Sequence, residues 1–284
     1  MMNKRIGLIA GSGSFPIIFS KKAASRGFSV CAVGFFDNTS PDLSDHVESL
    51  EIIHIGQIKR LIKFFKNRQI SEAVMIGAIK KPGAIRDIRP DMKAIALIAN
   101  MRHDTHDDRI LRAFAGVLEE EGIRIRSSTF LLPELLAEPG CWTQRKPTRA
   151  EQSDMALGWH MAKEVGRLDI GQCVVVSNGS VLAVEAIDGT DSTIRRGGEL
   201  GRGDAVVAKV CKPMQDLRFD VPAVGAQTIR TMHESGATVL VIEAGRSLVF
   251  DKDEMIRLAD QWGIAIVAME QAISEAQRKS DWKR

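Results

Sequence analysis

Short apolar segments alternate with amphipathic stretches through the first half of the chain. Runs of β-branched and apolar residues predict strands at Ile6–Ala10, Ser29–Gly34, Leu50–Ile55, Ala73–Gly77 and Ile123–Ser127. Apolar positions that recur every three or four residues predict helices at Phe15–Arg26, Gln57–Arg68, Asp91–Asn100 and Asp107–Glu121. This alternation is typical of βα units around a mostly parallel sheet, and it predicts an α/β domain over residues 1–130.

The pattern changes after this domain. Residues 131–149 contain three prolines and predict a connector, which a helix over residues 150–165 follows. Closely spaced strands are expected at Cys173–Ser177, Val181–Ala186, Ala205–Cys211 and Asp216–Val221. A helix at Val224–Ser235, a strand at Val239–Glu243, a helix at Asp253–Trp262 and a strand at Ile264–Ala268 complete the pattern. We therefore expect a connector and helix over residues 131–166 and a second α/β domain over residues 167–284.

The segment Lys212–Gly225 separates its charged and apolar residues if it is extended. Asp216, Arg218 and Asp220 would then face one way, with Leu217, Phe219 and Val221 facing a core. Two carboxylates and a guanidinium at a strand end would hold a divalent cation beside a phosphate, because oxygen ligands suit Mg²⁺ and a planar fork suits phosphate oxygens. The alternative is a solvated strand face on which Arg218 is flanked by two acidic partners.

Composition excludes several classes of protein. Of the 284 residues 44% are hydrophobic and 26% are charged, as in an ordinary globular protein. The net charge is only +3, and basic and acidic residues are interspersed, which argues against binding of DNA or RNA. The four cysteines lie far apart, so we expect free thiols in a reducing compartment. Ile6–Ala10 is too short for a signal peptide or a membrane span, which predicts a cytoplasmic protein, at most peripheral on a membrane.

A glycine-rich turn, Gly11-Ser12-Gly13, lies between the first expected strand and the first expected helix. Backbone N–H groups in such a turn can bind a phosphate. The third glycine of the dinucleotide-binding motif is missing, because Phe15 and Pro16 stand in its place. Asp37, after the second strand, could bind a ribose as the acidic residue of that motif does. A tight turn without a ligand is the alternative.

Two further clusters carry candidate chemistry. The segment His103-Asp-Thr-His-Asp-Asp108 looks like a metal site, although helix capping and the helix dipole explain several of its residues. Lys80 follows the Ala73–Gly77 strand at the edge where open α/β sheets bind ligands. A solvated basic loop is the alternative there.

Five motifs occur in one order along the chain, and together they resemble the LpxI family of UDP-2,3-diacylglucosamine pyrophosphatases. The motifs are Gly7-Leu-Ile-Ala-Gly-Ser-Gly-Ser-Phe-Pro16, Ile76-Gly-Ala-Ile-Lys-Lys-Pro82, Asp107-Asp-Arg-Ile-Leu111, Val184-Glu-Ala-Ile-Asp-Gly-Thr-Asp191 and Arg218-Phe-Asp-Val-Pro-Ala-Val-Gly225. The resemblance extends from residue 5 to about residue 272. The chain departs from the family's pattern at His106 and Asp188, which leaves details of the substrate open.

The resemblance implies a hydrolase of lipid A biosynthesis that requires Mg²⁺ and splits UDP-2,3-diacylglucosamine into UMP and 2,3-diacylglucosamine 1-phosphate. It implies a Rossmann-like N-terminal domain, a second α/β domain, a homodimer and a substrate site between the domains. The acyl chains of such a substrate imply peripheral contact with the inner membrane. Two alternatives stay open at this point: an NAD(P)-dependent oxidoreductase that uses the glycine turn, and a non-catalytic sugar-nucleotide-binding protein.

The resemblance also suggests roles for individual residues. Asp220 is the family's catalytic aspartate, and it would position Mg²⁺ or the attacking water, with Asp216 or Asp191 as a second ligand of the metal. The remaining candidates would bind the substrate: Gly11, Ser12, Gly13, Lys80, Asp107, Asp108, Thr190, Lys212 and Arg218.

Overall fold

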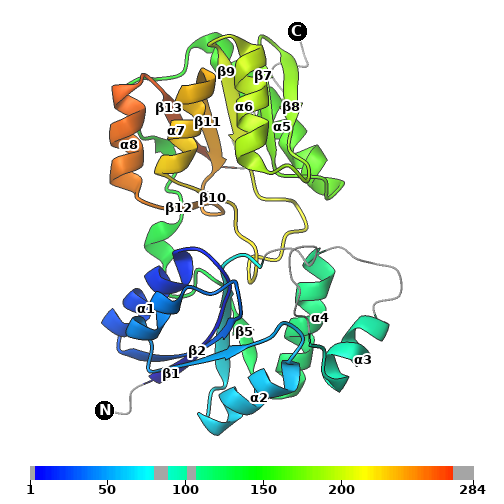
Figure 1. Ribbon diagram of the computed structural model, residues 1–284. Coiled ribbons are helices and arrows are strands. Elements are labelled where there is room, and N and C mark those ends of the chain that lie inside the picture. Colours follow the sequence, from blue (N-terminus) through cyan, green and yellow to red (C-terminus); the bar gives the residue numbers. More distant parts are fainter. Residues whose placement is uncertain (1–3, 80–88, 101–106, 271–284) are drawn as a thin grey trace. The chain divides into compact units, whose positions relative to one another are not determined.

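The computed structural model describes residues 4–79, 89–100 and 107–270, and it divides into two compact units. The N-terminal unit comprises Met1–Pro133 together with a short segment from the second half of the chain, Asp216–Asp220. The C-terminal unit comprises Glu134–Gln215 and Val221–Arg284. The elements of each unit can be followed in Figure 1.

The N-terminal unit alternates strands and helices. Its elements are β1 (Lys4–Ala10), α1 (Phe15–Ser25), β2 (Phe28–Phe35), the 3₁₀ helix η1 (Pro41–His46), β3 (Ser49–Ile53), α2 (Ile58–Asn67), β4 (Glu72–Ile76), α3 (Met92–Asn100), α4 (Asp107–Glu120) and β5 (Arg124–Arg126). The strands are all parallel and lie in the order β3-β2-β1-β4-β5. The elements predicted for this half of the chain are confirmed, with ends that differ by at most two residues.

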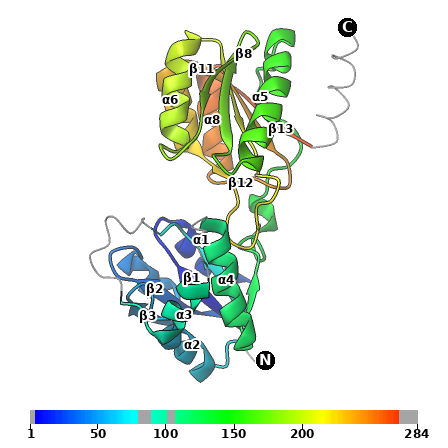
Figure 2. The same ribbon diagram turned by 90° about the vertical axis from the view of Figure 1, so that its right-hand side faces the viewer.

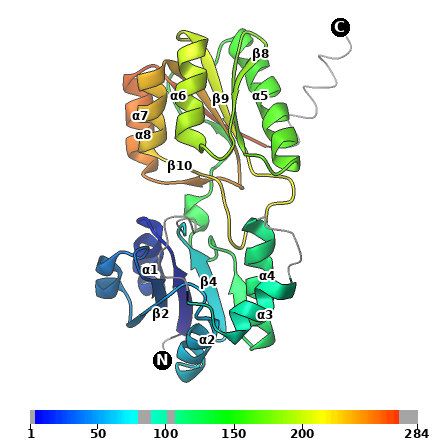
Figure 3. The same ribbon diagram turned by 45° about the vertical axis from the view of Figure 1, so that its right-hand side comes forward.

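Both faces of this sheet are covered, which explains why its strands read as continuous apolar runs. Ile9, Val33 and Ala73 pack with residues of α2 and α4 in one buried cluster. Figure 3 shows the strands between α1 on one side and α4 on the other. The carboxyl ends of β1, β2 and β3 meet at one edge, since Ala10 pairs with Gly34 and Phe35 pairs with Ile53.

The C-terminal unit is a second layered α/β structure. Its elements are η3 (Pro133–Leu135, which begins at the boundary), β6 (Gly140–Cys141), α5 (Arg149–Arg167), β7 (Cys173–Ser177), β8 (Ser180–Val184), α6 (Thr190–Gly201), β9 (Ala205–Lys209), β10 (Ala223–Val224), α7 (Ala226–Ser235), β11 (Ala237–Glu243), β12 (Leu248–Val249), α8 (Lys252–Gln261) and β13 (Ala265–Met269). The main sheet has the order β6-β13-β11-β9-β7-β8, in which β13, β11 and β9 are parallel. Figure 2 shows α5 on one face of this sheet and α6 and α8 on the other.

One helix of this unit has no counterpart in the sequence prediction. Helix α6 contains Gly197, Gly198 and Gly201, and glycine lowers helix propensity. The packing explains these residues, because a Cβ atom at Gly197 would lie 2.4 Å from the Cβ atom of Val175 in β7. The glycines therefore let the helix lie directly on the sheet.

The strand predicted at Asp216–Val221 is wrong, because these residues form a turn. The N–H groups of Phe219 and Asp220 both donate to the carbonyl oxygen of Asp216, at 3.0 and 3.2 Å. The carboxylate of Asp216 also accepts a hydrogen bond from the N–H of Arg218 at 3.1 Å. An aspartate that binds the backbone two residues ahead favours a turn over an extended strand.

Candidate functional site

The segment Asp216–Asp220 is part of the N-terminal unit although it lies far along the chain. Phe219 packs against the buried cluster that β1, α2 and α4 share. The hydroxyl of Ser127, just after β5, donates to the carbonyl oxygen of Leu217 at 3.1 Å. An aromatic anchor and a hydrogen bond to the backbone thus fix this segment on its unit.

Charged residues of the segment are paired with each other and with α4. The Arg218 guanidinium donates through Nε and Nη2 to the Asp216 carboxylate, with the shortest contact at 2.9 Å. Its Nη1 donates to Glu119 at 3.0 Å, and the Nε of Arg112 lies 3.6 Å from Asp216. Arg112 and Glu119 are seven residues apart on one helix, so they share a face. This spacing is the signal that could have revealed them in the sequence.

This network determines the ionisation of Asp216. Burial raises the pKa of its carboxyl, but the hydrogen bonds from Arg218 and the charges of Arg218 and Arg112 outweigh burial and lower the pKa below its usual value. The hydrogen bond with Asp216 is also the main reason that the pKa of Arg218 is raised. Asp216 is therefore an anion that arginines already neutralise, which makes it a poor ligand for a second cation.

Asp220 differs from Asp216, because its side chain is exposed at the end of the anchored turn. Arg218 is flanked by two acidic residues, as the solvated-strand alternative supposed, but they are Asp216 and Glu119 rather than Asp216 and Asp220. The segment therefore presents one exposed carboxylate next to a neutralised ion-pair network. Such a carboxylate can position a water molecule, accept a proton or bind a hard cation.

The glycine turn after β1 is braced by the neighbouring strand. The N–H groups of Gly11 and Ser12 donate to the carbonyl oxygens of Ile76 and Ala78, both at 2.8 Å. A Cβ atom at Gly11 would lie 2.5 Å from the backbone oxygen of Ala78, so a larger residue does not fit. Gly13 has φ +91° and open space at its Cα atom. Two of the N–H groups expected to bind phosphate thus belong to the sheet, and Gly13 is the open position of the turn.

Three candidate residues lie in the C-terminal unit. The hydroxyl of Thr190, at the start of α6, donates to the buried carboxylate of Glu185 at 2.7 Å. Asp191 follows it in the first turn of α6 and is exposed. The ammonium of Lys212 lies 2.6 Å from the carboxylate of Asp169. Among these three, Asp191 offers an exposed carboxylate, whereas Thr190 and Lys212 already have partners.

A buried ion pair holds the chain where it leaves β9 for the 216–220 segment. Lys163 of α5 donates to Glu243, at the end of β11, at 2.6 Å, and Glu243 is only 1% exposed. The same lysine donates to the carbonyl oxygen of Cys211 at 2.8 Å, and the N–H of Cys211 donates to Glu243 at 2.9 Å. The pair therefore forms hydrogen bonds with both the carbonyl oxygen and the N–H group of Cys211. No motif in the sequence indicated it, because its two members come from separate elements, α5 and β11.

Several predicted residues lie outside this description. Lys80 is not among the described residues, nor are His103 and His106. Asp107 and Asp108 begin α4 as expected, but their side chains also lie outside the described part. Within the described ranges, no three His, Cys, Asp or Glu side chains gather so that they could hold a metal ion.

Two general expectations can be checked. Cys31, Cys141, Cys173 and Cys211 all carry free thiols, and burial raises the pKa of the Cys173 thiol. None of the described helices combines the length and the apolar character needed to cross a bilayer.

Comparisons with known structures find distant likeness. The biotin carboxylase domain of a 2-oxoglutarate carboxylase from Hydrogenobacter thermophilus aligns over 63% of this chain and 36% of that chain, with 12% identity and a TM-score of 0.27. An N5-carboxyaminoimidazole ribonucleotide synthetase from Thermotoga maritima aligns over 65% and 42%, with 14% identity and a TM-score of 0.23. The chain thus spans less than half the length of these proteins, and likeness of this size carries no argument about function.

Comparisons of sequence are more specific. The family model described as the LpxI N-terminal domain matches residues 5–135, and the model of the LpxI C-terminal domain matches residues 138–267. The UDP-2,3-diacylglucosamine pyrophosphatase LpxI of Caulobacter vibrioides is 30% identical over 279 residues, which cover 94% of this chain and 98% of that protein. Both domains of the family are present in the family's order, and the chain belongs to the LpxI family.

Proposed function

We propose that this chain is a hydrolase that cleaves the pyrophosphate bond of UDP-2,3-diacylglucosamine and releases UMP and 2,3-diacylglucosamine 1-phosphate. The observation that carries this function is the match to a curated pyrophosphatase of that name over 98% of its length. The oxidoreductase alternative loses support, because the N–H groups of Gly11 and Ser12 bind the neighbouring strand and the dinucleotide-binding motif is incomplete.

Asp220 is the proposed catalytic residue. A pyrophosphate diester carries two negative charges, so attack by water requires a positioned nucleophile and screening of the charge that develops. Asp220 has an exposed carboxylate on a segment that Phe219 and Ser127 anchor, which supports a fixed position for a water molecule. Hydrogen bonds to Asp216 and Glu119 hold the Arg218 guanidinium on the same turn.

Mg²⁺ is the proposed cofactor, and the three candidate carboxylates differ in how well they could bind it. Exposed carboxylate oxygens are suitable ligands, and Asp220 and Asp191 each provide them. Asp216 does not fit, because Arg218 already binds its carboxylate through two nitrogens. When bound, the cation would screen the charge of the phosphates. The same proposal includes the residues expected to bind the substrate, which are Gly11, Ser12, Gly13, Lys80, Asp107, Asp108, Thr190, Lys212 and Arg218.

Three further properties belong to this proposal. The strand order β3-β2-β1-β4-β5 supports a Rossmann-like N-terminal unit, because doubly wound dinucleotide-binding folds share it. Exposed Met92, Ile95 and Ile98 of α3 support peripheral contact with a lipid surface. The homodimer rests on the family resemblance, and light scattering of the purified chain tests it.

One assay tests the function. The purified chain is incubated with UDP-2,3-diacylglucosamine and Mg²⁺, and UMP is measured by chromatography. We expect turnover that EDTA abolishes and that Mg²⁺ or Mn²⁺ restores. Absence of UMP with intact, folded protein contradicts the function and favours the sugar-nucleotide-binding alternative. Full activity in excess EDTA contradicts the proposed requirement for Mg²⁺ but leaves the hydrolase function in place.

A further inference from the structure

A buried lysine lies at the end of β9. Lys209 is the last residue of this strand, where it pairs with Cys173 of β7 on one side and Ile242 of β11 on the other, and it is only 8% exposed. Its ammonium donates a hydrogen bond to the carbonyl oxygen of Ala223 at 2.8 Å. A lysine is rarely buried to this degree, because removing an ammonium from water is costly unless it is hydrogen-bonded. Core packing alone therefore does not explain this side chain.

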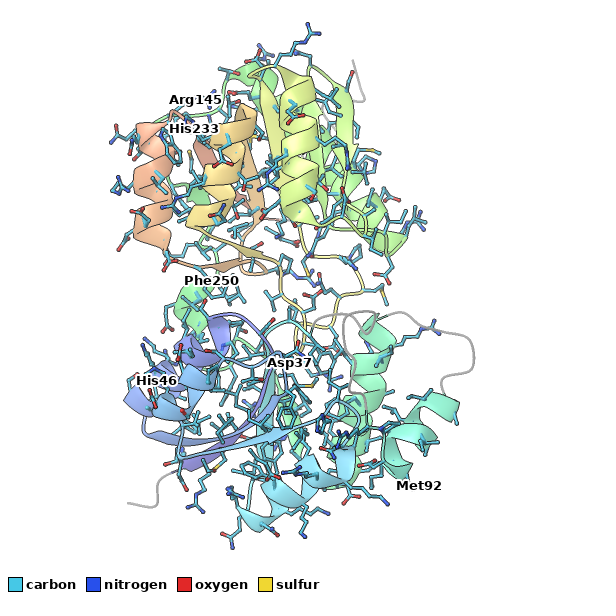
Figure 4. The ribbon with its side chains drawn as sticks, in the orientation of Figure 1. Asp37, His46, Met92, Arg145, His233 and Phe250 are labelled. Atoms are coloured by element: carbon cyan, nitrogen blue, oxygen red, sulfur yellow. The ribbon has the colours of Figure 1, made fainter. Side chains whose placement is uncertain are left out.

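The acceptor, Ala223, begins β10, which pairs in parallel with β12. The N–H of Leu248 donates to the carbonyl oxygen of Pro222 at 2.7 Å. The N–H of Phe250, which Figure 4 labels, donates to the carbonyl oxygen of Val224 at 2.9 Å. Successive carbonyl groups of a strand point to opposite sides, so the carbonyl group of Ala223 points away from β12. The buried ammonium binds this outer side, and β10 is therefore held on both sides.

These contacts hold the chain on either side of the segment that packs on the N-terminal unit. The chain leaves β9 after Lys209 and reaches β10 at Ala223, and Asp216–Asp220 lies between these two positions. The hydrogen bond between the lysine and Ala223 thus joins the two ends of this link. A fully extended chain spans at most about 11 Å over the three residue steps from Asp220 to Ala223. A fixed Ala223 therefore limits how far Asp220 can move from the end of β9.

We propose that Lys209 is a positioning residue for the reaction: it holds Ala223 and thereby restrains Asp220, the proposed catalytic residue. The proposal rests on the function argued above, and Lys209 acts through Asp220 rather than by touching the substrate. Displacement of a reacting group by about 1 Å can cost much of the rate, so a restraint this close in the chain affects kcat. Burial supports the role, because a hydrogen bond shielded from water is stronger than an exposed one.

The kinetics of Lys209→Met test the positioning role. Methionine is a long, unbranched side chain like lysine but has no donor for Ala223. We expect kcat to fall by roughly tenfold or more and KM to stay within about twofold of the wild-type value. In the Asp220→Ala background the same change should lower the residual kcat by less than about twofold, because its effect passes through Asp220. Equal effects in both backgrounds overturn the proposal. A raised KM with unchanged kcat also overturns it, since the ammonium would then bind the substrate directly.

Amide hydrogen exchange, followed by NMR without any substrate, measures the restraint itself. Lys209→Met should speed exchange of the N–H groups of Leu248 and Phe250 by roughly tenfold, because β10 loses its outer support. Lys209→Arg keeps a donor for Ala223 and should retain both the slow exchange and most of the wild-type kcat. Unchanged exchange in Lys209→Met, or slow exchange with lost activity in Lys209→Arg, overturns the proposal.

Asp154→Asn is the matched control in the same unit. The buried Asp154 carboxylate accepts hydrogen bonds from the N–H groups of Asn178 and Gly179, at 2.8 and 2.7 Å, in the turn at the opposite end of β7 from Cys173. The variant should speed exchange in that turn and leave kcat unchanged; a fall in kcat as large as that of Lys209→Met overturns the proposal. Failure of the proposed function is a separate result: the wild-type chain releases no UMP, whereas the exchange rates still respond to Lys209→Met.

Discussion

Asp216 and Asp220 lie four residues apart and have different environments. Asp216 is held by Arg218 and lies near Arg112, so its charge is already balanced. Asp220 is exposed at the end of the same turn. The sequence analysis predicted that both side chains lie on one face of a strand and that both are candidate ligands of Mg²⁺. The ion pairs of Asp216 shape the segment, and Asp220 is the residue that we propose for catalysis.

Replacing each aspartate by alanine should separate these roles. Asp220→Ala should lower kcat by roughly two to four orders of magnitude, as expected when a positioned acid or ligand is lost. The midpoint of thermal unfolding should change little, because the side chain is exposed. Asp216→Ala, the control on the same turn, should lower stability and reduce kcat less. If Asp220→Ala keeps more than about a tenth of the wild-type kcat, its catalytic assignment is wrong.

The lowered pKa of Asp216 predicts how docking of the segment depends on pH. The folded-state pKa lies below the unfolded value, so ionised Asp216 stabilises the docked turn. This contribution is fully present above about pH 4 and is lost as the pH falls through the lowered pKa. NMR contacts of the Phe219 ring should weaken in that acidic range. In Asp216→Asn the contacts should be weaker at neutral pH and nearly independent of pH; an unchanged acid transition in this variant contradicts the assignment.

Among the elements, β1 to β5 and α1 to α4 could be predicted from the sequence because their burial pattern follows their periodicity. The helix α6 could not, because its glycines are explained by close packing on Val175 rather than by local preference. The segment Asp216–Asp220 was mistaken for a strand for another reason. A turn that packs a partly buried Phe219 against the core, while its charged residues pair around it, produces the same alternation of polar and apolar residues as a strand.

The candidate site shows the same limit. The sequence proposed the glycine turn and Asp220 as candidates, since each stands in a motif, and both stay predictions. It could not show that Ile76 and Ala78 accept the N–H groups of the turn, because that depends on the register between β1 and β4. Nor could it show that Lys163 and Glu243 meet, since they lie on separate elements.

The glycine turn can be tested with a matched pair of variants. Gly13 and Gly27 both have positive φ, +91° and +77°, and both have open space at the Cα atom. Valine should therefore cost similar stability at either position, through backbone strain of roughly 1–2 kcal/mol. Gly13→Val should in addition raise KM, since its side chain would block approach to the turn. Equal KM values for Gly13→Val and Gly27→Val would show that the turn does not bind substrate.

The buried pair between α5 and β11 should be important for stability. Glu243→Gln leaves Lys163 without its charged partner in a largely buried position, which costs about 3–5 kcal/mol when such a pair is broken. Urea unfolding, followed by the fluorescence of Trp159 beside Lys163, measures the loss. Glu254→Gln breaks an exposed ion pair with Arg257 and should have a much smaller effect. Similar losses in both variants contradict the importance of the buried pair.

On the scale of the whole molecule, the segment Asp216–Asp220 joins the two halves of the chain. The whole segment belongs to the N-terminal unit, whereas the residues on both sides of it, up to Gln215 and from Val221 onward, belong to the C-terminal unit. The Lys163–Glu243 pair holds the chain at Cys211 before the segment, and Leu248 donates to the carbonyl oxygen of Pro222 after it, at 2.7 Å. The proposed catalytic residue thus depends on packing in both units.

Phe219→Ala should reveal this dependence. Loss of the ring opens a space in the cluster that Phe219 shares with α2 and α4, so the turn should lose its fixed position and kcat should fall by roughly tenfold or more. Phe219→Leu refills much of the space and should restore most of the activity. Circular dichroism checks that both variants fold. Wild-type kcat in Phe219→Ala would show that the anchor does not position Asp220.

The same segment also determines when the N-terminal unit can be completed during synthesis. Residues 134–215 are translated after Pro133 and before the segment Asp216–Asp220. Phe219 of this segment packs against the core cluster of the N-terminal unit. A nascent chain that ends before residue 220 therefore leaves part of this cluster without its aromatic partner. The ribosome must make most of the second half before the first half can acquire its final packing, and the proposed catalytic aspartate is placed by that last step.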